Sequence, residues 1–194
     1  QVDSKGTTFT GITTVVAGNG VDEIIGATDQ AWVLSGKNNK ITANDIDFSE
    51  VEAAVNGTVT GTDDSDSFTI SDAENTDKQV SVNEILFSNI SKVNAGDGAD
   101  EIIGAADQAW VLSGENNKIT ANNIAFSEVE GAVNGTVTGT DDSDSFTISD
   151  VVGTENQVTA NAILFSNISK VNAGDGADTV SGSNVWNLLA NGFE

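Results

Sequence analysis

Residues 87–104 have the sequence FSNISKVNAGDGADEIIG, and this phrase occurs in three related copies. Residues 165–182 read FSNISKVNAGDGADTVSG, and residues 9–26 read FTGITTVVAGNGVDEIIG. In chain order, the copies start at Phe9, Phe87 and Phe165. Successive starts are therefore separated by the same number of residues, 87 − 9 = 165 − 87 = 78. Because self-similarity at a fixed period is typical of repeat architectures, the repeat is the strongest indication of the fold.

The repeat covers almost the whole chain. Residues 17–94 align with residues 95–172 without a gap, and 15 of the 78 positions differ, so 78 − 15 = 63 are identical. Each copy divides into two 39-residue units, and the units start at Phe9, Phe48, Phe87, Phe126 and Phe165. We therefore expect residues 1–194 to form a single repeat domain, a fragment of a much longer protein, in which the divergent residues 183–194 form an end or a cap.

Short β-rich runs fill each unit. Examples are SFTIS, QAWVLSG, NKITA and GTVTG, and clusters of Gly, Asn and Asp separate them as turns require. One stretch, residues 48–55, has apolar spacings that would also suit two helical turns. The related phrase FSNISKV at residues 87–93 favours a strand. The pattern predicts an all-β protein.

Short strands that recur in every unit predict a right-handed parallel β-solenoid. We expect two coils of about 19–20 residues per unit, hence about ten coils and a rod of about 45–50 Å at about 4.8 Å per strand. A single large coil per unit is the alternative. The absence of proline fits either arrangement, because every backbone N–H can then take part in a ladder.

Composition excludes many kinds of chemistry. The chain has 7 basic residues, all lysine, and 30 acidic residues, for a net charge of −23, and it has no Cys or His. Zinc fingers, iron–sulfur clusters and Ser-His-Asp triads are therefore ruled out. The negative charge repels nucleic acid and anionic membranes, and no apolar run is long enough to span a bilayer. We expect no catalytic residues, no nucleic-acid partner and no membrane insertion.

Two kinds of acidic turn recur. The AGxGxD turns span residues 17–22, 95–100 and 173–178, and the GTDDSD turns span residues 61–66 and 139–144. The AGxGxD turns resemble the nonapeptide of RTX (repeats-in-toxin) proteins, GGxGxD followed by an apolar residue, with alanine in place of the first glycine. In that motif the glycines shape the turn and the aspartate supplies a carboxylate to calcium.

This resemblance implies calcium as a cofactor. The candidate ligands are Asp22, Asp97, Asp100, Asp175 and Asp178 in the AGxGxD turns, and Asp64, Asp66, Asp142 and Asp144 in the GTDDSD turns. RTX nonapeptides occur in tandem, whereas this phrase occurs once in each copy of the long repeat. With four coils between copies, Asp22 and Asp100 would lie roughly 19 Å apart, and each GTDDSD turn would lie about two coils from the nearest AGxGxD turn. The alternative is that each aspartate caps the backbone of its own turn.

Phrases such as FSNISKVNAGDGADEIIG also resemble the repeat regions of large bacterial surface exoproteins, the filamentous-haemagglutinin-like and RTX-type adhesins. The resemblance implies a secreted, acidic stalk displayed on the surface of a Gram-negative cell. Its partner would be a cell-surface molecule, a carbohydrate or another copy of the chain.

A carbohydrate-binding or carbohydrate-active β-helix is the alternative function. Trp32 and Trp110 occur in identical QAWVLSG phrases and could stack on sugar rings, although packing in the core would also explain them. A carboxylate pair could serve a glycosidase. Asp45 and Asp47 are acidic residues that break the repeat, but they resemble drift on a surface. We therefore expect a non-enzymatic protein.

Overall fold

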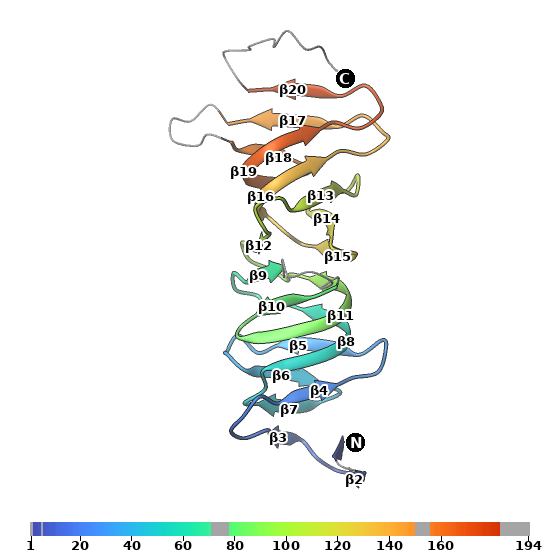
Figure 1. Cartoon of the computed structure of the whole chain (residues 1–194), viewed down its shortest axis with the longest axis vertical. Coiled ribbons are helices and arrows are strands. Elements are labelled where there is room, and N and C mark those ends of the chain that lie inside the picture. The colour runs from blue at the N-terminus through green and yellow to red at the C-terminus, as the bar shows by residue number, and fades with distance from the viewer. Residues whose placement is uncertain (1, 5, 71–77, 150–155, 183–194) are drawn as a thin grey trace.

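The computed structural model describes residues 2–4, 6–70, 78–149 and 156–182, and these residues form a rod made of β-strands (Figure 1). The described residues contain no helix. Most pairings between successive turns of the chain are parallel, and the strands stack into a β-solenoid of about five turns. The predicted all-β parallel solenoid is confirmed, and its handedness stays a prediction.

The strands, in chain order, are β1 (Val2–Ser4), β2 (Thr7–Phe9), β3 (Thr14–Val16), β4 (Glu23–Ile25), β5 (Ala31–Leu34), β6 (Lys40–Ala43), β7 (Ile46–Ser49), β8 (Ala53–Thr60), β9 (Ser67–Ile70), β10 (Val80–Val82), β11 (Ile85–Asn94), β12 (Glu101–Ile103), β13 (Ala109–Leu112), β14 (Lys118–Ala121), β15 (Ile124–Ser127), β16 (Gly131–Thr138), β17 (Ser145–Ile148), β18 (Val158–Ala160), β19 (Ile163–Asn172) and β20 (Thr179–Ser181). The predicted strand runs are confirmed. Residues 48–55 run from the end of β7 into the start of β8, so the helical alternative is wrong.

The strands form two faces that enclose the core. Face 1 has the order β4–β8–β11–β10–β9–β12–β16–β19–β18–β17–β20. Face 2 has the order β3–β7–β6–β5–β8–β11–β15–β14–β13–β16–β19. The long strands β8, β11, β16 and β19 contribute their first halves to face 1 and their second halves to face 2.

Asparagine builds the corner between the two faces. Asn56 in the middle of β8 has a φ of 73°, in the left-handed region that asparagine tolerates better than most residues. Its side chain donates to Gly26 O and accepts from Asn89 Nδ2 in the next turn of the solenoid. Trp32 Nε1 donates to the carbonyl of Asn56. These bonds fix the corner.

Each of the four complete repeat units also contains an antiparallel meander, such as β5–β6–β7 on face 2 and β9–β10–β11 on face 1. The second hairpin of every meander closes with a two-residue turn in which both φ angles are positive, the geometry of a type I′ turn. The four turns are Asn44-Asp45, Asn83-Glu84, Asn122-Asn123 and Asn161-Ala162.

The meanders overturn the prediction of two coils per unit. Ile24 pairs with Ala54, and Ala54 pairs with Phe87, so the paired positions differ by 54 − 24 = 30 and 87 − 54 = 33 in the sequence. Both separations are far longer than the predicted coil. Each unit therefore makes one large turn, as in the alternative, and the remaining residues fold back within the sheet instead of forming a second coil. Eleven strands on each face still give a rod of about 48 Å, and each copy of the long repeat adds five strands to each face, or about 24 Å.

The core lies between the two faces and repeats with the sequence. Phe48, Phe87, Phe126 and Phe165, which mark the starts of the units, are all buried. Phe9 is exposed because it lies in the hairpin β1–β2, which forms a separate two-stranded sheet. The divergent residues 183–194 lie outside the described residues.

Candidate functional site

The two kinds of acidic turn stack directly on each other. The GTDDSD turn joins β8 to β9, the next AGxGxD turn joins β11 to β12, and these strands pair in register. Asp66 N donates to Asp100 Oδ1 at 2.7 Å, and Asp144 N donates to Asp178 Oδ1 at 2.9 Å. The prediction that the two kinds of turn lie about two coils apart is therefore wrong. The antiparallel meander brings the chain back beside the earlier turn, so the two turns lie in adjacent layers.

Glycine permits this close stacking. A Cβ on Gly96 would lie 2.0 Å from Thr62 O, and a Cβ on Gly61 would lie 1.7 Å from Ala95 O. Gly96 also has a φ of +105°, which side chains rarely allow. Ala95, which stands where the RTX motif has its first glycine, is fully buried and packs in the core.

The aspartates of the two kinds of turn have different roles. Asp66 Oδ2 accepts from Thr62 N at 2.6 Å and from Thr62 Oγ1 at 3.0 Å, and Asp144 makes the same bonds to Thr140. These two residues cap their own turns, as the alternative interpretation proposed. Asp100 and Asp178 instead accept the backbone N–H of the turn in the layer beneath.

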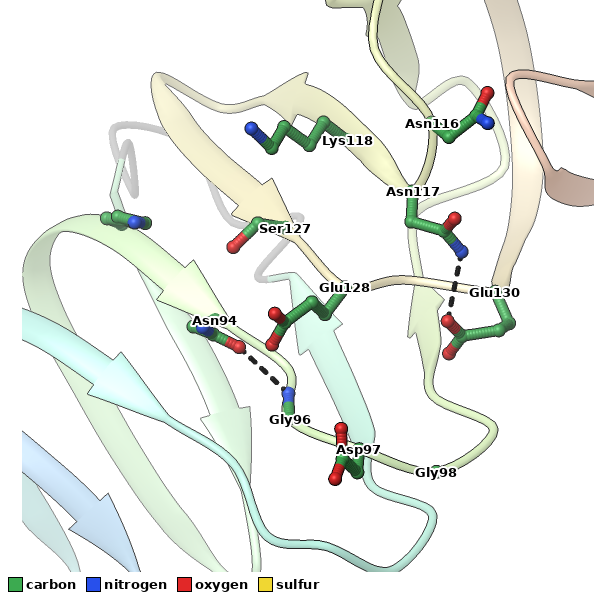
Figure 2. A pocket seen from close by; sticks show the side chains of 11 residues that line it. Asn94, Gly96, Asp97, Gly98, Asn116, Asn117, Lys118, Ser127, Glu128 and Glu130 are labelled. Carbon is green, nitrogen blue, oxygen red and sulfur yellow. Dashed lines mark hydrogen bonds between the residues drawn. The ribbon is translucent and has the colours of Figure 1, made fainter.

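Asp100 is the most unusual carboxylate of the described residues. Its side chain is 1% exposed, and its Oδ2 is buried without a hydrogen-bond partner. Glu130 Oε2 accepts from Asp100 N at 2.9 Å. Glu130 Oε1 accepts from Asn117 Nδ2 at 2.9 Å, as Figure 2 shows. Loss of hydration on burial raises the pKa of Asp100 to about 6, and the charges of Glu130, Asp66 and Glu128 add to the rise.

The other aspartates of the AGxGxD turns differ from Asp100. Asp22 is half-buried and its Oδ2 also has no partner, but no GTDDSD turn lies beneath it among the described residues. Asp178 is half-buried and has no described layer above it. One sequence motif therefore occupies three environments, which depend on the neighbouring layers.

The candidate calcium ligands do not gather into a cage. Within the described ranges, no three acidic side chains are placed to share an ion. The carboxylates of Asp66, Asp100, Asp144 and Asp178 accept backbone N–H groups, whereas Asp64, Asp97, Asp142 and Asp175 are exposed. This arrangement does not fit the six to eight oxygens that calcium takes. Calcium binding stays a prediction from the sequence.

A polar groove of about 600 Å³ lies beside this stack of turns (Figure 2). Its lining includes Lys92, Asp97, Asn117, Lys118, Glu128 and Glu130. The sequence motifs did not single out Asn117 or Glu130. The available signal was their repetition, since Asn39 and Glu52 occupy the same places in the preceding copy and their side chains also meet.

The remaining sequence candidates do not form a site. Trp32 and Trp110 are 1% and 0% exposed, so a sugar-stacking role is wrong for them and packing in the core is confirmed. Asp45 and Asp47 are exposed, and Asp47 Oδ1 accepts from Thr42 Oγ1. No helix in the described part of the chain is long and apolar enough to cross a membrane.

Comparison with protein-family models, curated proteins and solved structures finds no match to this chain.

Proposed function

We propose that this chain is a structural and adhesive repeat module, a stalk segment of a secreted bacterial surface adhesin. The observation that supports this most is the recurrence of the layer contacts. The turn-to-turn bond from Asp66 to Asp100 recurs from Asp144 to Asp178 in the next copy of the repeat, with lengths of 2.7 and 2.9 Å. Such a unit can be added many times without changing the cross-section of the rod.

The location at the cell surface rests on the resemblance of the repeats and on charge. A net charge of −23 keeps parallel rods apart in solution and resists non-specific binding to anionic surfaces. A spacer that holds a binding domain away from a cell benefits from both properties. No enzymatic step is part of this proposal.

Small-angle X-ray scattering of lengthened chains tests the spacer role. Duplication of residues 95–172 directly after residue 172 should increase the maximum dimension by about 24 Å per added copy, because each copy adds five strand spacings to both faces. The cross-sectional radius should stay that of the unmodified chain. A cross-section that widens, or a length that does not grow with copy number, would refute the spacer role.

The polar groove supports a second candidate, carbohydrate binding. It offers amide, carboxylate and ammonium groups from Asn117, Glu130 and Lys92, which can hydrogen-bond hydroxyl groups. A glycan array with the wild-type chain and a Lys92→Ala variant tests it. Binding that the variant loses would favour this role, and the absence of any bound glycan would leave the spacer alone.

A further inference from the structure

Asparagine is followed directly by glycine at four places in the chain. The pairs are Asn19-Gly20, Asn56-Gly57, Asn134-Gly135 and Asn191-Gly192, and the last lies outside the described residues. Because glycine has no Cβ, its backbone nitrogen can approach the side-chain carbon of the preceding asparagine with little steric hindrance. Such a pair can lose its side-chain amide without an enzyme, provided that the folded structure leaves both groups free to react.

The fold holds two of these asparagines in place. Asn56 Nδ2 donates to Gly26 O at 2.8 Å, and Asn56 Oδ1 accepts from Asn89 Nδ2 at 2.7 Å. Asn134 makes the equivalent two bonds, at 2.8 and 2.6 Å. Both asparagines lie inside long strands, β8 and β16, and a Cβ on the glycine that follows would lie 1.9 or 2.0 Å from a neighbouring backbone oxygen. Reaction at either pair would have to break these contacts.

Asn19 is in a different environment. It is exposed, in the AGxGxD turn of residues 17–22. Its side chain has no hydrogen bond to any described residue, and no described group accepts from Gly20 N. Gly18 and Gly20 flank it with φ angles of 107° and 140°, which glycine adopts without strain. The two groups that would react are therefore not held by any described partner.

This freedom is a property of the turn and does not require an open layer beneath it. In the next copy, the turn of residues 61–66 lies beneath residues 95–100, yet Asp97, at the place of Asn19, is still exposed. Gly98 N, at the place of Gly20 N, also has no acceptor among the described residues. A layer beneath Asn19 would thus leave both reacting groups without a partner.

We propose that Asn19 is a site of spontaneous deamidation in the folded chain. The backbone nitrogen of Gly20 loses its proton to the solvent and attacks Asn19 Cγ, so that a C–N bond forms. The side-chain nitrogen takes up a proton from the solvent and leaves as ammonia. Water then opens the cyclic succinimide at one of its two carbonyl carbons, which leaves aspartate or isoaspartate at position 19. Water is the only other reactant.

The turn already accommodates the aspartate product elsewhere in the chain. Asp97 and Asp175 occupy the same place in the other two copies. The three turns share one backbone shape, since the first glycine has φ angles of 107°, 105° and 93° and the second has 140°, 130° and 114°. Deamidation to aspartate therefore gives the first turn the acidic pattern of the others and adds one negative charge. The reaction concerns this chain alone and is independent of the role proposed above.

Peptide mapping after incubation of the folded chain in heavy-oxygen water tests the proposal. Trypsin, used afterwards in ordinary water, cleaves after lysine and places the three described pairs on separate peptides, residues 6–37, 41–78 and 119–170. Tandem mass spectrometry locates the heavy oxygen that ring opening leaves behind. Asn19 should take up label at least about tenfold faster than Asn56 or Asn134, because ring closure at those two breaks two hydrogen bonds each.

Two controls separate the effect of the fold from that of the sequence. In urea that unfolds the chain, the contacts of Asn56 and Asn134 are lost, so the three pairs should react at similar rates. Asn19→Asp carries the product from the start and should keep the β-sheet spectrum in circular dichroism. Equal rates at the three pairs in the folded chain would overturn the proposal. So would a difference that persists in urea, or an Asn19→Asp variant that loses the β-sheet spectrum.

Discussion

Asp100→Asn should stabilise the rod at neutral pH and leave its stability unchanged in acid. The amide keeps Oδ1 as the acceptor for Asp66 N, which is the one bond that the side chain makes. It replaces the unpartnered Oδ2 with a neutral NH₂ group, which the negative charge of Glu130 does not disfavour. The substitution therefore removes a buried charge without removing a hydrogen bond.

The magnitude follows from the pKa of Asp100, which rises from 3.8 to about 6 on folding. Because the folded state holds the proton more tightly, ionisation of Asp100 destabilises the fold, and the free energy of unfolding falls between about pH 4 and pH 6. At 1.36 kcal/mol per pKa unit, the upper limit of this penalty is about 3 kcal/mol. Water at the nearby surface screens part of it, so we expect a gain of about 1–2 kcal/mol at pH 7.5.

Urea unfolding followed by tryptophan fluorescence measures this gain, since Trp32 and Trp110 are buried in the fold. The difference in the free energy of unfolding between variant and wild type isolates the effect of Asp100, because the other carboxylates are the same in both proteins. Asp178→Asn is the matched control, because it removes the same charge from an equivalent turn that is half-buried. The reasoning is refuted if Asp100→Asn gains nothing at pH 7.5, gains as much at pH 4, or gains no more than Asp178→Asn.

Three other measurements test the stacked turns and the hairpins. Gly96→Ala should lower the free energy of unfolding by at least about 3 kcal/mol, because the new Cβ would strike the turn beneath it. Gly18→Ala is the control, since Gly18 has almost the same φ with nothing within 4 Å of the new Cβ, and it should cost only the backbone strain of about 1–2 kcal/mol. Equal losses would contradict the steric role of the lower turn. Ala162→Gly should raise the free energy of unfolding by about 0.5–1 kcal/mol, because Ala162 has a φ of 62°, which glycine adopts without strain. Glu84→Gly at the equivalent place should have the same effect. A lower free energy of unfolding in both variants would show that the turns are unstrained. Calcium should leave the melting temperature as it is in EGTA or magnesium, because within the described residues the carboxylates of the stacked turns accept backbone N–H groups and form no cage for an ion. A calcium-specific rise that Asp100→Asn reduces would instead support calcium binding, because an ion that binds only the folded state stabilises it.

The repeat made the fold class predictable, but the sequence did not predict the path of the chain within each unit. A strand that starts a new coil and a strand that folds back in a hairpin both alternate with a period of two, so periodicity cannot separate them. The distinguishing signal lay in the two-residue turns. Asn83-Glu84 and Asn161-Ala162 lack the glycine that usually marks a type I′ turn, and this absence concealed the hairpins.

Local sequence patterns also could not predict the environment of the acidic turns. Asp22, Asp100 and Asp178 occupy the same motif, and the sequence treats them alike. The burial of each aspartate depends on the layers beneath and above it. For Asp100, the layer beneath comes from residues 34 positions earlier and the layer above from residues 30 positions later. Only the alignment of Glu52 with Glu130 in successive copies indicated that a glutamate accompanies the turn.

Repetition and charge have opposing effects in this molecule. Each layer of turns fits the next, because Asp66 N and Asp144 N donate to the carboxylates of Asp100 and Asp178. The acidic turns carry that complementarity, since Asp66 and Asp100 form the contact between layers, yet they also supply much of the charge that keeps rods apart. The unfavourable burial of Asp100 is then the local cost of placing repulsive charge inside the stack. If this reasoning is correct, Asp100→Asn should lower the net negative charge by one and stabilise the rod at neutral pH.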